Sequence, residues 1–450
     1  MNGCRVWTHG TGGFLRDFVA ACLPEGDYRR VFVKPNWVRH QVDPAFPIEA
    51  LVTDTRLVEA TIEACLEKYR RLEALTVADA PLLDCDFRLL EAQAGIGRLR
   101  ERFGRLHKPR IEILDLRAER ARRSAGGYLE RFTDGCGDPL GIAEVVLGAE
   151  SLLDEITTQE VRFRVSDYDA LRTRSHHRPG FHRYRIAASA LASDLFVNLP
   201  KMKTHQKAGI TGALKNLVGV VADKSCLTHF RTGKPEAGGD EFAPGTPVLM
   251  RVQSRMRERL QSRSRVLFRL AAAGWRVLRR FGRVEVRGLP EHLQKRFYAA
   301  GGAWWGNDTI WRMIYDLNRI LCYAPAGGGH LGRLPQRDYV AILDGMVAGE
   351  GNGPLQPLPV RANVLIASKD PFLADTAMAA LMGFDWERIP ALARRRRFWE
   401  PWGCFETADV RCLLDNRAVR GIASLPVIHG FLPPPGWRGR IERTERRNVA

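Results

Sequence analysis

Hydrophobic residues follow two different periods along the chain, and their alternation predicts the fold class. Short runs rich in apolar and β-branched residues, typical of buried strands, occur at 31–36, 75–80, 111–116, 195–200, 340–345 and 363–368. Helical spacing follows in VEATIEACLEKY and in the stretch from about Asp86 to Phe103. Strands that alternate with helices predict an α/β fold with a mostly parallel sheet flanked by helices.

Capping residues mark two of the predicted helices. Asp54 precedes VEATIEACLEKY, and Asp370-Pro371 opens DPFLADTAMAALMG, which ends at Gly383. Ligands of parallel sheets gather at the carboxyl ends of strands, where we expect 34–36 (Lys-Pro-Asn) and Asp79.

Shifts in composition divide the chain into six segments, without any internal repeat. These are a first part of the α/β sheet (1–116), an irregular excursion or subdomain (117–185), an α/β core segment with lysines and histidine (186–234), a basic amphipathic helical insertion (235–335), the last part of the α/β core (336–385) and an Arg- and Pro-rich C-terminal tail (386–450).

The insertion contains one face of helical apolar residues surrounded by arginines. That face comprises Leu267, Leu270, Ala271, Gly274, Trp275, Leu278 and Phe281. Residues 251–287 contain 12 Arg against Glu258 and Glu285, a local charge of +10. Two interpretations stay open: a surface that contacts an anionic membrane or a protein partner, or a helix docked on its own domain with solvated arginines.

Composition bounds the partners and the compartment. The formal charge of +18 favours anionic partners, but over half of it comes from 251–287, and we do not expect a nucleic-acid partner. Nine scattered cysteines without a CxxC pair are typical of a reduced cytoplasmic interior. The N-terminus lacks the apolar stretch of a signal peptide, and no 18 apolar residues run together, so we expect no transmembrane span. We expect a cytoplasmic location, with peripheral contact with the inner membrane face as an option.

Lysine use is concentrated in one segment. The chain has 11 Lys against 58 Arg, yet 201–224 contains five lysines and no arginine. Lysine differs from arginine in its compact charge and in a pKa that burial can lower. This contrast favours a ligand-binding or catalytic segment over a solvated basic loop.

The spacing within that segment suggests roles for individual residues. In an extended stretch Lys201, Lys203 and His205 point to one side, because side chains alternate. We expect a phosphate or carboxylate to be held there while the imidazole transfers a proton. The expected catalytic residues are His205, Lys203 and Lys215, and the expected substrate-binding residues are Lys34, Asn36, Lys201, Asn216, Lys224 and His229.

Acidic residues gather in the last third of the chain. Asp344, Glu350 and Asp375 could form an ion-pair network with the lysines, an acid–base pair, or ligands for a divalent cation such as Mg²⁺. Asp370 is explained as a helix cap. His176, His177 and His182 lie among arginines, which opposes cation binding and favours a surface loop that contacts anions. The sequence contains no P-loop, no GxGxxG after a strand and no GxSxG motif.

Five blocks together resemble the domain-of-unknown-function 362 family. They are KPN (34–36), TDTRLVEATIE (53–63), VNLPKMKTHQKAGITGALKNLVG (197–219), LDGMVAGEGNGP (343–354) and IASKDPFLADTAMAALMGF (366–384). The resemblance implies an α/β fold and independent support for the lysine segment. Some relatives have ferredoxin-type iron–sulfur motifs, but this chain lacks those cysteines, so we expect no cysteine-ligated cluster.

Three functional interpretations follow. The leading one is a cytoplasmic enzyme that acts on an anionic small molecule, phosphorylated or carboxylated, with Asp344 and Glu350 binding a cation or serving as the opposing base. The second is a redox protein that lacks its own cysteine-ligated cluster. The third is a non-catalytic module that binds membrane or nucleic acid through the arginines of 251–287.

Overall fold

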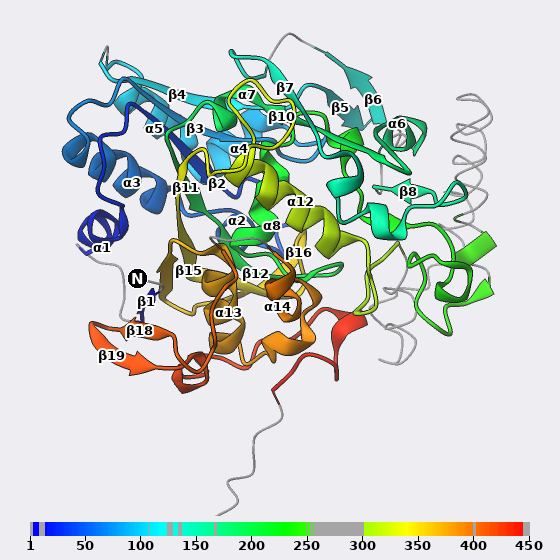
Figure 1. Cartoon of the computed structure of the whole chain (residues 1–450). Coiled ribbons are helices and arrows are strands. Elements are labelled where there is room, and N and C mark those ends of the chain that lie inside the picture. Colours follow the sequence, from blue (N-terminus) through cyan, green and yellow to red (C-terminus); the bar gives the residue numbers. More distant parts are fainter. Residues whose placement is uncertain are drawn as a thin grey trace, which may run out of the picture.

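A mixed, mostly parallel sheet forms the centre of the protein, and the α/β class is confirmed (Figure 1). The computed structural model describes residues 3–8, 14–106, 108–123, 129–133, 137–165, 168, 170–248, 250–252, 254, 301–398 and 402–443. Within them, the main sheet has 12 strands. Nine of these follow the order β19 (Arg417–Arg420), β18 (Arg411–Leu414), β1 (Gly3–Trp7), β17 (Val364–Ser368), β15 (Asp338–Asn352), β11 (Leu195–Leu199), β2 (Arg30–Pro35), β3 (Ala74–Asp79) and β4 (Arg110–Asp115).

The predicted strands lie where the hydrophobic runs are, but two differ in extent or direction. β15, β11, β2, β3 and β4 are parallel neighbours. β15 runs well beyond the predicted 340–345, because its second half pairs with β12 (Lys201–His205) and β16 (Gln356–Val360). β17 is antiparallel to both β15 and β1, so this part of the sheet is not parallel. β13 (Gly209–Ile210) turns back antiparallel to β12.

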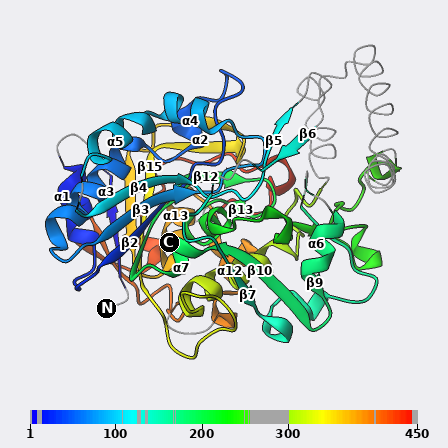
Figure 2. The ribbon, with the colours of Figure 1, turned by 90° about the horizontal axis from the view of Figure 1, so that it is seen from above.

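Helices cover both faces of the sheet, which therefore separates two apolar cores (Figure 2). Side chains alternate between the faces: Val31 and Val33 enter one core while Phe32 enters the other. The first core is covered by α1 (Leu15–Cys22), α2 (Ile48–Leu51), α3 (Thr55–Lys68), α4 (Phe87–Ala94) and α5 (Ile96–Phe103), and the second by α7 (Ala188–Leu191), α8 (Ala213–Asn216), α12 (Ile310–Tyr323), α13 (Pro371–Leu381) and α14 (Pro390–Ala393).

The predicted helix caps are present. The Asp54 carboxylate accepts the Arg56 N–H at 2.8 Å at the start of α3. Asp370 accepts the Phe372 N–H at 2.8 Å at the start of α13, with Pro371 as the first helical residue. The helix predicted over 86–103 is two helices, because Gly95 adopts φ 72° between α4 and α5.

The segment 117–185 forms small sheets beside the second core. They are built from β5 (Arg120–Arg123), β6 (Leu129–Phe132), β7 (Ile142–Val146), β8 (Phe163–Arg164), β9 (His177–Arg178), β10 (Phe181–Ala187) and β14 (Phe230–Arg231), next to α6 (Ala170–His176). The prediction that His176, His177 and His182 lie in a surface loop that contacts anions is wrong. His176, His177 and His182 are buried, and the Nδ1 atoms of His177 and His182 lie 3.1 Å apart. His177 Nε2 contacts the Cys226 carbonyl at 2.6 Å.

Residues 255–300 lie outside the described residues, and with them the expected amphipathic face from Leu267 to Phe281. The expected insertion 235–335 also contains α12, a core helix with almost every residue buried. Within the described residues, no helix has both the length and the apolar character needed to cross a bilayer.

The segment 386–450 adds strands β18 and β19 to the main sheet, beside the N-terminal strand β1. Cys4 of β1 and Cys412 of β18 are register partners, and their Sγ atoms lie 2.8 Å apart in a buried position. Trp437 is fully buried and donates its indole N–H to the Gln206 carbonyl at 2.6 Å. The C-terminal residues therefore pack against the lysine segment.

Candidate functional site

The carboxyl ends of neighbouring parallel strands bring a buried ion pair together. β2 and β11 end at the same level, with Leu199 opposite Pro35. Lys34 Nζ lies 2.9 Å from Asp79 Oδ1, and both side chains are buried. The second Asp79 oxygen accepts the Trp37 N–H at 2.6 Å. Burial lowers the pKa of Lys34, and the charge of Asp79 opposes that shift.

A chain of amides lies beside this pair. Asn36 Nδ2 donates to Asn216 Oδ1 at 2.9 Å, and Asn216 Nδ2 donates to Asn198 Oδ1 at 2.7 Å. Asn198 Nδ2 in turn donates to the Tyr339 hydroxyl at 2.8 Å. Asn36 Oδ1 is buried without a hydrogen-bond partner among the described residues. Two of the predicted substrate-binding residues are therefore neighbours, and one has a free acceptor.

Lys201 is neutralised by an acidic partner. Its Nζ lies 2.8 Å from Asp344 Oδ2, and neither side chain is exposed. The same carboxylate accepts the Asp54 N–H at 2.7 Å and the Met346 N–H at 3.0 Å. A buried, fully hydrogen-bonded ion pair of this kind holds β12 and β15 together.

Lys203 lacks such a partner. The register of β12 against β15 shifts between Lys201 and Lys203, which separates the environments of the two amines. Lys203 Nζ donates to the Leu51 carbonyl at 2.5 Å. Burial, and then the charges of Lys201 and Lys215, lower the pKa of Lys203 well below 10.5.

His205 lies at the turn between β12 and β13. Its Nδ1 accepts the backbone N–H groups of Lys207 and Ala208 at 3.1 and 3.2 Å. Burial, and then the charge of Lys215, lower the pKa of His205 well below 6.5, so the ring is neutral at pH 7. With Nδ1 accepting, the single ring proton is on Nε2.

Lys215 is the amine without a partner. It lies on the short helix α8, and the structure gives its side chain no hydrogen bond or ion pair within the described residues. Burial, and then the charge of Lys207, lower its pKa to about 7. The side chain lines a cavity of about 10 Å³, enough for about one water molecule. The cavity is lined by Ala208, Ile210, Leu214, Lys215, Ile314, Asp375, Ala391 and Leu392.

Asp375 fixes the helix that carries Lys215. Its carboxylate oxygens accept the Ala213 N–H at 2.5 Å and the Leu214 N–H at 3.0 Å. Burial raises the pKa of Asp375 to about 8, against the effect of these two hydrogen bonds. Gly212 permits the contact: its φ is 118°, and a Cβ there would lie 2.1 Å from Asp375 Oδ1.

Lys224 and His229 complete the site. Lys224 Nζ donates to the Val218 carbonyl, and burial lowers its pKa to about 7. His229 Nε2 is buried with no hydrogen-bond partner among the described residues. Burial, and then the charge of Lys215, lower the pKa of His229 well below 6.5.

We call Lys203, His205, Lys215, Lys224 and His229 the lysine–histidine cluster. The charge of Lys215 lowers the pKa of each of the other four, which places its amine near all of them. Within the described residues, no ion pair joins any of the five to a carboxylate. Within the described residues the cluster therefore pairs with no carboxylate, although the charge of Asp79 opposes the lowering of the pKa values of Lys203 and Lys224.

The three expected metal ligands lie apart. Asp344 pairs with Lys201, and Asp375 holds α8. Glu350 Oε2 accepts the Leu432 N–H at 2.8 Å and lies 3.8 Å from His429 Nε2. The described part of the chain contains no group of three or more His, Cys, Asp and Glu side chains placed to hold a metal ion.

Sequence reasoning missed two contributors to the site, Lys207 and Asn198, and one pairing, that of Asp79, which was expected at this edge of the sheet. Lys207 Nζ donates to the Gly301 carbonyl at 2.5 Å and lies 4.7 Å from the centre of the Phe230 ring, and its charge reaches Lys215. Asn198 links the amides, and Asp79 pairs with Lys34. A polar residue inside the apolar run LFVNL was a signal for Asn198; no local signal identified Asp79 as the partner of Lys34.

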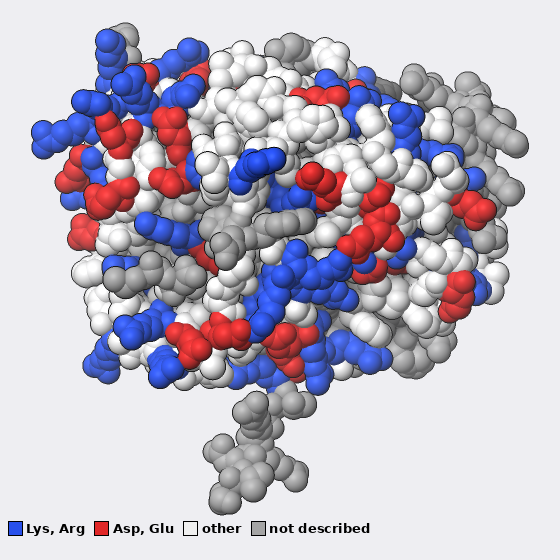
Figure 3. Space-filling view, viewed as in Figure 1, with Lys and Arg blue, Asp and Glu red and all other residues white. Residues whose placement is uncertain are grey.

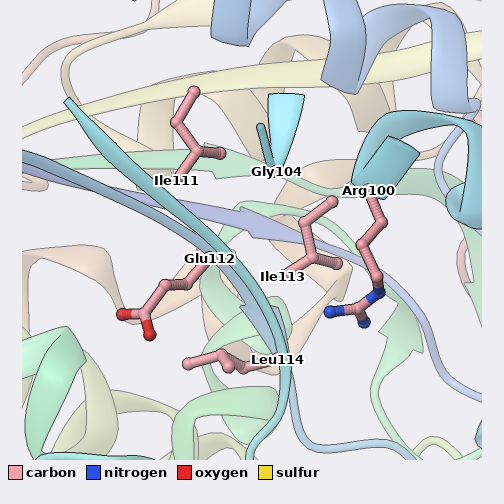
Figure 4. Close-up of a pocket in the computed structure, with 6 residues that line it drawn as sticks. All are labelled: Arg100, Gly104, Ile111, Glu112, Ile113 and Leu114. Carbon is pink, nitrogen blue, oxygen red and sulfur yellow. The ribbon is translucent and has the colours of Figure 1, made fainter. Parts of the chain in front are cut away.

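A larger hollow lies elsewhere, on the edge strand β4 (Figure 4). It measures about 250 Å³ and is lined by Arg100, Gly104 and the residues 111–114. Its two charged groups are already paired, because Arg100 contacts Glu91 at 2.6 Å and Glu112 contacts Arg110 at 2.6 Å. The hollow lacks the unpartnered polar groups of the lysine–histidine cluster.

Many positive side chains on the surface form ion pairs with acidic neighbours, unlike the lysines of the cluster within the described residues. On the face shown in Figure 3, Lys and Arg side chains are interspersed with Asp and Glu. Many arginines are paired, for example Arg395 with Glu387 at 2.9 Å and Arg71 with Asp27 at 2.8 Å. The Lys215 amine differs from these groups, because it is partly buried and has no partner within the described residues.

Together, fold and site define an α/β protein with a buried lysine–histidine cluster at the carboxyl ends of parallel strands. The chain belongs to the family described as "Domain of unknown function (DUF362)", whose model matches residues 132–380. That match contains every member of the cluster, and it confirms the resemblance that the sequence blocks suggested.

Two further comparisons are more distant. The chain is 23% identical over 289 residues to a protein of Synechocystis sp. named "Thylakoid-associated protein sll1697". The match covers 64% of this chain and 61% of the relative's length. The chain also matches a crystal structure of a Thermotoga maritima protein at 11% identity and a TM-score of 0.34. This match covers 78% of the present chain and 53% of the Thermotoga maritima chain.

Proposed function

We propose that this protein is an enzyme that binds a small anion, phosphorylated or carboxylated, at the lysine–histidine cluster, with Lys215 at the centre of the chemistry. The observation that carries the proposal is the partly buried Lys215 amine, which has no hydrogen-bond or ion-pair partner within the described residues and whose charge acts on four other cationic or titratable side chains. Isolated buried charges are strongly unfavourable unless they are paired. A bound anion supplies the missing counter-charge.

The donors around Lys215 suit an anionic ligand. The chain offers the amines of Lys203 and Lys224 and the Nε2–H of His205 as donors. The buried Nε2 of His229 is unpartnered, and so is the buried hydroxyl of Thr211 next to Gly212. Unpartnered buried polar groups are rare in folded proteins, and a ligand or ordered water satisfies them.

Acid–base chemistry is assigned to Lys215 and His205. A group with a pKa near 7 is populated in both protonation states at neutral pH, which suits general acid–base catalysis. Lys215 meets that condition at about 7. The sequence led us to expect Asp344 and Glu350 as the opposing base. We do not propose that role for them, because both carboxylates accept backbone N–H groups away from Lys215. A divalent cation stays a prediction, which metal analysis of the purified protein tests.

The cavity beside Lys215 has room for about one water molecule. A larger anion therefore enters only when side chains between α12 and α14 move apart. Ile314 of α12 and Leu392 of α14 line this cavity together with Lys215.

Thermal denaturation in the presence of anions tests the proposal. We expect inorganic phosphate, or a small carboxylate such as glyoxylate, to raise the melting temperature of the wild-type protein relative to chloride at equal ionic strength. Lys215→Met should lose this stabilisation, whereas Lys369→Met, at an exposed position, should retain it. Equal responses of the two variants would refute the cluster as the anion site.

Location is a separate proposal. A cytoplasmic protein that contacts an anionic membrane through 251–287 is supported by the local charge of +10 and by the relative whose name says thylakoid-associated. Flotation with vesicles that contain anionic lipid, compared with the same protein lacking 251–287, tests it. Binding that persists without this segment would contradict the proposal.

A further inference from the structure

Three independent features set Lys215 apart from the other lysines of the site. Its amine has no hydrogen-bond or ion-pair partner within the described residues, whereas Lys34, Lys203 and Lys224 each donate to a fixed acceptor. It lines a cavity whose other walls are mostly aliphatic. Two neutral imidazoles, His205 and His229, lie within range of its charge.

We propose that Lys215 Nζ is a nucleophile that forms a Schiff base with a carbonyl carbon of the anionic substrate, so that the substrate class is a small oxo acid or a carbonyl compound that carries a phosphate. This inference rests on the proposed function, because the cationic cluster supplies the affinity for the anionic part. The carbonyl part is specified by the amine in its aliphatic cavity.

The proposed step balances without an oxidant or a metal. The amine lone pair forms a C–N bond to the carbonyl carbon, and one proton of the nitrogen moves to the carbonyl oxygen to give a carbinolamine. The carbon–oxygen bond then breaks, water leaves, and the nitrogen and carbon share the new double bond. The second proton of the nitrogen leaves with the oxygen as water, and the neutral His205 ring is assigned a hydrogen bond from its Nε2–H to that oxygen.

Burial makes the reactive form of this amine abundant. With a pKa of about 7, about half of Lys215 is the neutral amine at pH 7. An exposed lysine with a pKa near 10.4 is neutral in only about 0.04% of molecules at that pH. Desolvation of a lysine in an apolar pocket beside other cations is an established route to a nucleophilic amine.

Reductive trapping on the full-length protein tests the inference. Glyoxylate and sodium cyanoborohydride convert a Schiff base into a stable secondary amine, and peptide mass spectrometry locates it. At pH 7 we expect Lys215 to be modified at least tenfold faster than the exposed comparators Lys108, Lys234 and Lys369. Inorganic phosphate should slow modification of Lys215 and leave the comparators unchanged.

The pH profile and a charge-preserving variant serve as controls. Modification of Lys215 should rise with a midpoint near pH 7, whereas the comparators should rise toward pH 10. Lys215→Arg keeps the charge but should show no modification at this position and no change at the other three.

The outcomes separate the two proposals. If phosphate stabilises the protein but Lys215 reacts no faster than the comparators, the nucleophile inference is overturned and the anion site stands. If Lys215 reacts rapidly but phosphate neither slows it nor stabilises the protein, the amine is a nucleophile and the anion-binding function is refuted. If both responses are absent, both proposals fall.

Discussion

Replacing Lys215 by methionine should make the protein more stable, because it removes an unpaired charge from a partly buried position. A pKa lowered from 10.5 to about 7 corresponds to an unfavourable free energy of at most about 5 kcal/mol for the charged amine, at about 1.36 kcal/mol per pKa unit. Water that reaches the cavity reduces this value, so we expect a gain of roughly 2–4 kcal/mol. Methionine is an unbranched side chain that fills irregular space among Ile210, Leu214 and Ile314.

The sign of the pH dependence follows from the direction of the shift. Below pH 7 the amine is protonated in both folded and unfolded chains, and the folded state bears the whole penalty. Between pH 7 and about 10.5 the unfolded chain holds a proton that the folded chain has lost, so wild-type stability rises with pH. The advantage of Lys215→Met should therefore be largest at pH 6.5 and shrink to about 1 kcal/mol at pH 9.5.

Urea denaturation followed by tryptophan fluorescence measures the effect, since the chain has 10 tryptophans. Lys369→Met is the matched control, because that lysine is exposed, and its unfolding free energy should stay within about 0.5 kcal/mol of the wild type. A Lys215→Met protein that is no more stable than the control at pH 6.5 would refute the view of Lys215 as a partly buried cation without a partner. A variant that is more stable yet no longer binds phosphate is the expected signature of a functional residue.

Three further predictions concern other groups. Lys203→Arg should lose nearly as much phosphate stabilisation as Lys203→Ala, because the larger guanidinium cannot replace a buried amine that donates to one carbonyl; an unchanged thermal shift would mean that only the charge matters. Burial lowers the pKa values of His177 and His182, so these rings bind protons in the unfolded chain at a higher pH than in the folded protein. The free energy of unfolding should therefore fall below pH 6.5, by up to about 1.4 kcal/mol per pH unit for each ring. A urea midpoint that stays constant between pH 6.5 and 5 would contradict this. Diamide should join Cys4 to Cys412, detected by non-reducing peptide mapping and by a melting temperature that rises and returns with dithiothreitol, and Cys412→Ser should not respond.

Much of the fold follows from local sequence patterns. The central strands β2, β3 and β11 lie within runs of buried apolar residues, and the caps Asp54 and Asp370 mark the helix starts, because both signals depend on neighbouring residues. Strand direction is different. β17 follows β16 in the chain and pairs antiparallel with the first half of β15, while β18 comes from beyond residue 410. The direction of strand pairing depends on tertiary packing, which the local spacing of apolar residues does not indicate.

The candidate site was predictable in its location but not in its pairings. The concentration of lysine and the absence of arginine in 201–224 identified the segment that contains most of the cluster. The sequence could not tell that Lys201 is neutralised by Asp344 whereas Lys215 is left alone, because that difference depends on a register shift in β12 and on the fold of α8. His177 and His182 were misjudged because their local surroundings are charged, and only the folded chain removes them from water.

The position of β1 has a consequence for synthesis of the chain. This strand pairs with β17 on one side and β18 on the other, and both partners are synthesised about 360–400 residues after it. At roughly 5–20 residues per second, Gly3–Trp7 waits on the order of 20–80 s for its complete set of backbone hydrogen bonds. During that interval the nascent chain exposes an unpaired strand, which is a target for ribosome-bound chaperones.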